Sequence, residues 1–125
     1  MPNIDRNVYD NMRRVLQAAG QLQQVTQSFC SNSDGRITAI FRAIEDQDAL
    51  QISEIAHALK GSCAMFGAKG CSELCQQIES ACNNASAETN YEHLRHLTLN
   101  LQEELQEIYN FIQCQSSSEK PECCP

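Results

Sequence analysis

The sequence predicts an all-α protein, and its composition is the first reason. Gln, Glu, Ala and Leu are abundant, whereas the 125 residues include only 5 Gly and 3 Pro, a mixture that favours helices over strands. Apolar residues also recur at three- and four-residue steps through most of the chain, as they do on one face of an α-helix. A chain of this length forms one domain around one core.

The first two helices are expected before residue 46. Asn3 or Asp5 can cap the first, a short helix that ends before Gly20. Residues 21–45 are interpreted as one longer helix, although residues 31–35 are rich in residues that weaken helices and mark the place for a kink or fraying. The apolar positions that carry these two patterns are Val8, Met12, Val15, Leu16, Leu22, Val25, Phe29, Ile37, Ile40, Phe41 and Ile44.

The third and fourth helices are expected on either side of Gly67. Asp48, with Gln51 three residues later, resembles a capping box that starts the third helix, and Gly67 is a natural C-terminal cap for it. The fourth helix is expected over residues 68–83, with Gly70 an unusual residue so early in a helix. Its predicted buried residues are Cys71, Leu74, Cys75, Ile78 and Cys82.

The fifth helix has the clearest pattern in the chain. It is expected to begin near Thr89, with Glu92 completing a capping box. Leucine and isoleucine then form a seam typical of a long helix in an antiparallel bundle, at Leu94, Leu97, Leu101, Leu105, Ile108 and Ile112. We therefore expect a folded domain over residues 1–114 and a disordered tail over residues 115–125.

The charge and the hydropathy pattern exclude several classes of function. The net charge is −7 and the nine basic residues are scattered, which argues against binding to nucleic acid. No window approaches the roughly 18 consecutive apolar residues of a membrane span, and residues 1–6 lack the start of an export signal. The expectation is a soluble, cytoplasmic protein whose eight cysteines are free thiols.

His57 is the candidate functional residue. When the third helix is wound at about 100° per residue, its core residues fall within roughly 80°, and His57 lies roughly 150° from the centre of that face. The core residues are Ile52, Ile55, Ala56, Leu59, Cys63 and Phe66, and the residues that share the outward side with His57 are Ser53, Lys60, Gly61 and Ala64. His57 is therefore expected to point to solvent among small side chains.

This pattern indicates phosphoryl chemistry. A neutral imidazole near pH 7 is a competent nucleophile, and Lys60 can offset the charge of a phosphoryl group placed on it. A glycine inside a helix, such as Gly61, lowers its stability by about 1 kcal/mol relative to Ala. The space that it leaves for a partner or a phosphoryl oxygen would compensate for this cost. The sequence has no P-loop, no kinase glycine loop and no obvious acidic cluster for Mg²⁺. His57 would therefore exchange its phosphoryl group with other proteins.

The segment resembles the signature of histidine-containing phosphotransfer (HPt) domains, over about residues 4–113. The matching runs are Ala56-His57-Ala58-Leu59-Lys60-Gly61-Ser62, Gly67-Ala68 and Leu74-Cys75-Gln76-Gln77-Ile78-Glu79, with Cys71 where such domains usually have Leu. The resemblance implies an antiparallel up-down four-helix bundle with an additional short N-terminal helix. It further implies phosphorylation of His57, charge support from Lys60, and close approach of a response regulator at Gly61, with Ser53 and Ala64 beside it.

The same resemblance implies a relay. A phosphoryl group would move from an aspartate of a receiver domain to His57, through Nε2, and then to an aspartate of a response regulator. The receiver domains, one of them in a hybrid sensor kinase, would supply Mg²⁺. The protein itself would be a free-standing, monomeric bacterial carrier that binds no cofactor and no metal, and that is neither an enzyme with an ATP site nor an autonomous kinase.

Other interpretations of these residues compete with this one. Cys71 and Cys75 could bind Zn²⁺ if Cys63 and a histidine approached them, but filling of the core is favoured over a metal site. His93 and His96 are spaced for a metal yet fit a solvated face, and Cys123 and Cys124 receive no role. The alternative function is a non-catalytic helical adaptor that binds a receiver or another signalling partner without phosphorylation.

Overall fold

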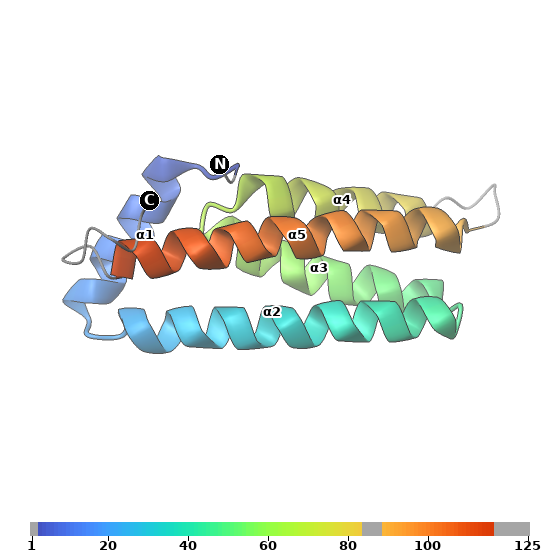
Figure 1. Cartoon of the computed structure of the whole chain (residues 1–125), viewed down its shortest axis with the longest axis horizontal. Helices are drawn as coiled ribbons and strands as arrows, with labels where there is room; N and C mark the ends of the chain where they lie inside the picture. Colours follow the sequence, from blue (N-terminus) through green and yellow to red (C-terminus); the bar gives the residue numbers. More distant parts are fainter. Residues whose placement is uncertain (1–2, 84–88, 117–125) are drawn as a thin grey trace.

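The structure is a computed structural model that describes residues 3–83 and 89–116. Within those residues the chain forms five helices and no strand: α1 (Arg6–Ala18), α2 (Leu22–Glu45), α3 (Ala49–Met65), α4 (Lys69–Cys82) and α5 (Tyr91–Ser116) (Figure 1). The prediction of an all-α fold is therefore confirmed. None of these helices is long and apolar enough to cross a membrane.

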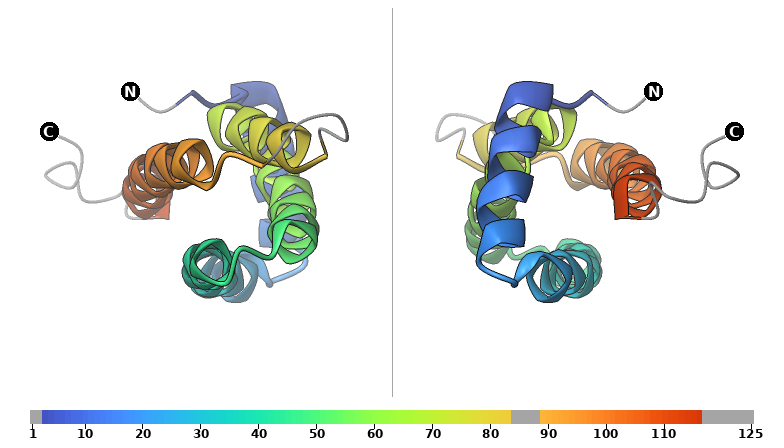
Figure 2. Two further views of the ribbon diagram at one scale, coloured as in Figure 1. Left: turned by 90° about the vertical axis from the view of Figure 1, so that its right-hand side faces the viewer. Right: turned by 90° about the vertical axis from the view of Figure 1, so that its left-hand side faces the viewer.

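Four of the helices form the bundle, and α1 lies across one end of it. In the end-on views of Figure 2, α2, α3, α4 and α5 surround a common axis, with α3 between α2 and α4. Short turns connect α2 to α3 and α3 to α4, so successive helices run in opposite directions (Figure 1). This is the expected antiparallel four-helix bundle with an additional N-terminal helix.

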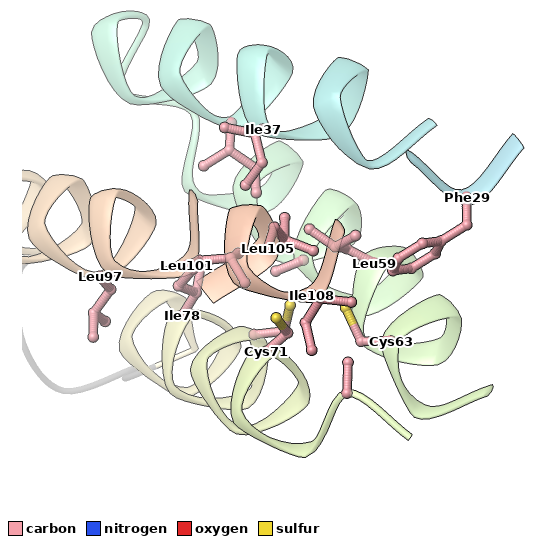
Figure 3. Packing of buried hydrophobic residues seen from close by; sticks show 14 of the residues in the cluster. Phe29, Ile37, Leu59, Cys63, Cys71, Ile78, Leu97, Leu101, Leu105 and Ile108 are labelled. Carbon is pink, nitrogen blue, oxygen red and sulfur yellow. The ribbon is translucent and has the colours of Figure 1, made fainter. Parts of the chain in front are cut away.

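The core is built from the predicted apolar faces. All six residues of the seam on α5 are buried, and on α3 the residues Ile52, Ala56, Leu59 and Cys63 have no exposed surface. Ile78 of α4 and Leu101 of α5 are buried in the same cluster (Figure 3). Each fully buried leucine or isoleucine contributes about 1.5–3 kcal/mol through removal of its side chain from water.

The weak middle of α2 remains helical because its neighbours hold it. The helix is continuous from Leu22 to Glu45, and Ser33 is fully buried inside it. The hydroxyl group of Tyr109 of α5 donates a hydrogen bond to Asp34 at 3.0 Å and lies 3.4 Å from the backbone oxygen of Cys30. Packing against α5 therefore outweighs the low helix propensity of residues 31–35.

The turn between α3 and α4 requires Gly67, and a second glycine, Gly70, follows in the first turn of α4. Gly67 has a φ of 72°, and a Cβ added there would lie 2.6 Å from the backbone oxygen of Asp5. A Cβ on Gly70 would lie 2.6 Å from Oε2 of Glu104, and the Gly70 N–H donates to the oxygen of Asn3 at 3.0 Å. Because the Asp5 N–H also donates to the oxygen of Gly67 at 2.7 Å, the amino-terminal segment is fastened to this turn.

Side-chain hydrogen bonds identify the capping residues at the start of α1, α3 and α5. Asp5 caps α1 through the N–H groups of Asn7 and Val8, and Asp48 caps α3 through the Gln51 N–H at 3.2 Å, both as predicted. The helix α5 begins at Tyr91, near the expected Thr89, but Thr89 does not cap it. Asn90 is the cap, because its side chain accepts from the His93 N–H at 3.0 Å.

The far end of the chain also differs in detail from the expectation. The helix α5 continues to Ser116, two residues beyond the expected end of the domain. Residues 117–125, the rest of the expected tail, lie outside the described residues, as do Cys123 and Cys124.

Candidate functional site

The helix α3 presents two different faces, and His57 stands on the outer one. Its side chain is 71% exposed, whereas Ala56 and Leu59 on either side of it in sequence are completely buried. The predicted orientation of His57 toward solvent is therefore observed. Only Ile55, among the residues predicted for the core face, remains partly exposed.

The imidazole of His57 is held from the neighbouring helix. Nδ1 lies 3.1 Å from Oε2 of Glu79 on α4. An ionised carboxylate only accepts hydrogen bonds, so this contact requires the proton of the neutral ring to be on Nδ1. The second nitrogen, Nε2, then keeps its lone pair, and the exposure of the side chain leaves it open to solvent.

Lys60 is fixed to the same carboxylate. Its Nζ lies 2.7 Å from Oε1 of Glu79 in an ion pair and donates a hydrogen bond to Oε1 of Gln76 at 2.8 Å. Gln76 in turn donates to Oγ of Ser80 at 3.2 Å. The lysine ammonium, which is 27% exposed at the side-chain level, is thus held beside the imidazole by two residues of α4.

The carboxyl group of Glu79 is ionised in this arrangement. Burial by itself raises the pKa of Glu79, but the hydrogen bonds and charge of Lys60 and then of His57 outweigh it, and the pKa is lowered from 4.5. Only 13% of the Glu79 side chain is exposed. A negative charge is therefore present between the two basic side chains throughout the neutral range.

The side chains beside His57 on the outward side of α3, those of Ser53, Gly61 and Ala64, are small although packing does not require all of them to be. A Cβ added to Gly61 would meet nothing within 4 Å, so packing does not require glycine there. Ala64 is exposed and Ser53 is half-buried. Beside this row an open groove runs between α1, α3 and α4, lined in part by Val8, Lys60, Ala64 and Gln76.

The thiols beneath this site form a compact buried group. Cys63 of α3 hydrogen bonds with Cys71 and Cys75 of α4, and all three residues are completely buried. Figure 3 shows Cys63 and Cys71 in this interior. Hydrogen bonding with Cys71, together with burial, raises the pKa of Cys63, and hydrogen bonding with Cys63 does so for Cys75. These protonated thiols fill the core between the helices that carry His57 and Glu79.

The metal hypotheses gain no support from this geometry. Cys63 does approach Cys71 and Cys75, but no group of three histidine, cysteine or acidic residues within 3–83 and 89–116 is arranged to hold a metal ion. His96 pairs with Glu92 at 3.7 Å, and both side chains are about 70% exposed, as expected for a solvated helix face.

Sequence reasoning missed the part that Glu79 plays. In the sequence Glu79 stands only as the last residue of the run Leu74-Cys75-Gln76-Gln77-Ile78-Glu79, 22 residues after His57 and with no sign of a contact with it. Its contact with His57 depends on how α3 and α4 are paired across the turn at Gly67. The available signal was its spacing: Glu79 follows Cys75 of the predicted core face by four residues, which places its carboxylate next to that face of the helix.

Comparison with known proteins gives a family match and a similarity in fold to a solved structure. Residues 24–110 match the family model described as the Hpt domain. The fold is similar to the crystal structure of histidine-containing phosphotransfer protein B (HptB) from Pseudomonas aeruginosa PAO1, with a TM-score of 0.83 and 17% identity over 94% of this chain and 96% of that one. No curated protein sequence matches significantly.

Proposed function

The chain belongs to the Hpt domain family, and we propose that His57 accepts a phosphoryl group from an aspartate of one receiver domain and passes it to an aspartate of a response regulator. The family acts in phosphotransfer between proteins of two-component phosphorelays. The donor here would be the receiver domain of a hybrid sensor kinase, and the protein would act in the cytoplasm as a monomer.

One observation carries the proposal to this particular residue. His57 is 71% exposed, and its Nδ1 is occupied by Glu79 at 3.1 Å. The free lone pair is therefore on Nε2, the nitrogen that can reach the phosphorus of an incoming aspartyl phosphate. Lys60, held 2.7 Å from the same carboxylate, provides a positive charge for the phosphoryl oxygens.

The remaining chemistry would come from the partner. In this proposal the chain binds no cofactor and no nucleotide, and the receiver domain supplies Mg²⁺ and most of the stabilisation of the transition state. Proteins of this family are phosphocarriers and not autonomous kinases. The contribution of this chain is a fixed, exposed nucleophile on a rigid helix.

The contact surface would be the outer row of α3. Ser53, Gly61 and Ala64 leave room for a partner beside His57, and a side chain at Gly61 would project into empty space. A carrier must release each partner quickly, so the interface is expected to bury at most about 1,200 Å² in total.

The test is phosphotransfer profiling. The purified chain is mixed with each phosphorylated receiver domain of its own cell, and the label is followed over time. Acid-labile, alkali-stable label that appears on wild type and is lost in His57→Gln is the expected result. Label that persists on the variant would show that another residue is phosphorylated.

The alternative adaptor function has a distinct outcome in the same assay. An adaptor binds a receiver domain without taking up its phosphoryl group. Binding that survives in both wild type and His57→Gln, without label on either protein, would favour that function. The presence of His57, Lys60 and Gly61 together favours the carrier, because a surface used only for binding has no need of a nucleophile.

A further inference from the structure

We propose that Glu79 keeps a proton on Nδ1 of His57 throughout the phosphoryl cycle, so that the phosphorylated ring remains in its cationic, readily transferred form. The proposal rests on the proposed function, since it concerns the state of His57 after phosphorylation. It makes Glu79 a positioning residue that also sets how long the phosphoryl group stays on the protein.

The geometry leaves Glu79 a single hydrogen-bonding role toward the ring. Oε2 lies 3.1 Å from Nδ1, and an ionised carboxylate has no proton to donate. An Nδ1 without a proton would place a lone pair against that negative oxygen. An Nδ1–H instead makes a hydrogen bond that becomes stronger when the ring carries positive charge.

The proton count of the reaction fits this role. In the forward step the Nε2 lone pair attacks phosphorus, the N–P bond forms, and the P–O bond to the donor aspartate breaks with its electron pair on the carboxylate. The ring becomes a phosphorylated imidazolium that still carries Nδ1–H. In the return step an aspartate oxygen attacks phosphorus and the N–P electron pair goes back to Nε2, which leaves neutral imidazole.

A proton on Nδ1 makes the ring a good leaving group. If Nδ1 lost its proton after phosphorylation, the N–P bond would have to break to give an imidazolate anion, a far more basic leaving group. By favouring the cation, Glu79 keeps the phosphoryl group transferable at neutral pH. The same effect shortens the lifetime of the phosphorylated protein in water, because water can also attack the cationic form.

Few other charges face the ring. Lys60 of α3 shares the carboxylate of Glu79 at 2.7 Å and opposes the effect in part, since it is also a cation. On α4, Cys75 is protonated and buried beneath the pair. Glu54, one turn before His57, is exposed, and Arg36 of α2 is engaged by Oγ of Ser62 at 3.2 Å. The carboxylate of Glu79 is the contact that acts directly on Nδ1.

The test measures how hydrolysis of phosphorylated His57 depends on pH. The full chain is phosphorylated with phosphoramidate, a small donor that needs no partner protein, and the loss of the phosphoryl group is followed by ³¹P NMR between about pH 5 and pH 9. Hydrolysis is fast at low pH and slows as the ring loses its proton. The pH at the midpoint of that change is the measured quantity.

Glu79→Gln removes the charge and keeps the size of the side chain. The amide can accept from Nδ1–H or donate to a bare Nδ1, so it no longer favours the cation. The midpoint is expected to fall by about one pH unit, the low end of the effect of a neighbouring opposite charge, because His57 is largely exposed. Above the wild-type midpoint the phosphorylated variant is expected to live up to about ten times longer than wild type.

Two comparisons separate this effect from a structural one. Glu54→Gln removes an equal charge one turn from His57 and is expected to leave the midpoint unchanged, whereas Glu79→Asp is expected to restore part of the wild-type value. If Glu79→Gln does not fold, phosphorylated wild type in denaturing urea serves as the reference, and its midpoint should fall in the same direction.

The outcomes distinguish this proposal from the one on which it rests. Equal midpoints in wild type and Glu79→Gln, or in folded and denatured wild type, would overturn the role of Glu79 and leave His57 as the phosphorylated residue. Failure of phosphoramidate and of every receiver domain to label wild type at His57 would instead overturn the proposed function itself.

Discussion

The two faces of α3 differ in what fixes their residues. On the inner face Ile52, Ala56, Leu59 and Cys63 have no exposed surface, and each is constrained by the volume that its neighbours leave. On the outer face His57 is largely exposed and Gly61 borders empty space. Stability therefore limits substitution on one side of this helix, and chemistry limits it on the other.

The faces meet at the α3–α4 seam, where Lys60 and Glu79 lie. Both side chains are more buried than His57 and form the 2.7 Å ion pair beside it. Changes at this seam should affect function and stability together. Changes on either face should affect one property and spare the other, which gives the comparison measurable consequences.

The largest expected effect on function belongs to His57→Gln. The variant should accept no phosphoryl group, whereas its free energy of unfolding should stay within about 0.5 kcal/mol of wild type because the side chain lies outside the core. Urea unfolding monitored by circular dichroism, with the transfer assay in parallel, measures both. A large loss of stability would mean that the outer face contributes to the fold.

Leu59→Ala tests the inner face two residues away. Leu59 is completely buried, so its truncation should cost about 2–5 kcal/mol of unfolding free energy through lost burial and a cavity. The fraction that remains folded should still carry phosphate on His57. A cost below about 1 kcal/mol would show that the core around α3 relaxes around the cavity.

Gly61→Glu should reverse that pattern. Bulk and negative charge on the outer row of α3 should slow phosphoryl transfer by about tenfold or more. The free energy of unfolding should be unchanged or slightly higher, because glycine disfavours helix. Gly35→Glu is the matched control, since Gly35 is a second mid-helix glycine whose added Cβ meets nothing within 4 Å. Equal losses of transfer rate in both variants would contradict a docking role specific to the row of His57.

Asp48→Ala tests the end of α3, apart from either face. The loss of its hydrogen bond to the Gln51 N–H should cost about 1 kcal/mol of stability. Transfer rates should be those of wild type under conditions where the variant is fully folded. A change in the rate alone would mean that fraying at the start of the helix reaches His57.

The smallest expected effect is on the stability of the protein in acid, through the ion pair of Lys60 with Glu79. The pKa of Glu79 is lowered from 4.5 in the folded protein, so its ion pair stabilises the fold above that value and the contribution disappears as pH falls through the lower pKa. The difference in unfolding free energy between wild type and Glu79→Gln should therefore shrink below about pH 4.5. A difference that is constant from neutral pH to pH 3 would contradict this account.

Much of the fold was predictable because burial repeats along a helix. The seam of α5 and the inner face of α3 follow from spacing alone, since every third or fourth residue must face the core. The cap of α5 was less certain, because Thr89 and Asn90 are both good capping residues and the sequence does not decide between adjacent candidates. The hydrogen bond from His93 decides for Asn90.

The candidate site was predictable only within one helix. The exposure of His57 and the proximity of Lys60 and Gly61 follow from the winding of α3. The contact with Glu79 depends on the register between α3 and α4, which is set by the turn at Gly67 and by the packing of Cys63 against Cys71 and Cys75. Such a register has no local signal in the sequence.

The segment that contains Asn3 and Asp5 helps to fix the register between α3 and α4. Asn3 and Asp5 hydrogen bond to Gly70 and Gly67, on both sides of the turn that joins α3 to α4. This turn is about 15 Å from His57 along the helix, yet it fixes how the imidazole and its carboxylate face each other. A change that broke these two hydrogen bonds would therefore be expected to alter the pairing of α3 with α4 and, through it, the geometry at the nucleophile.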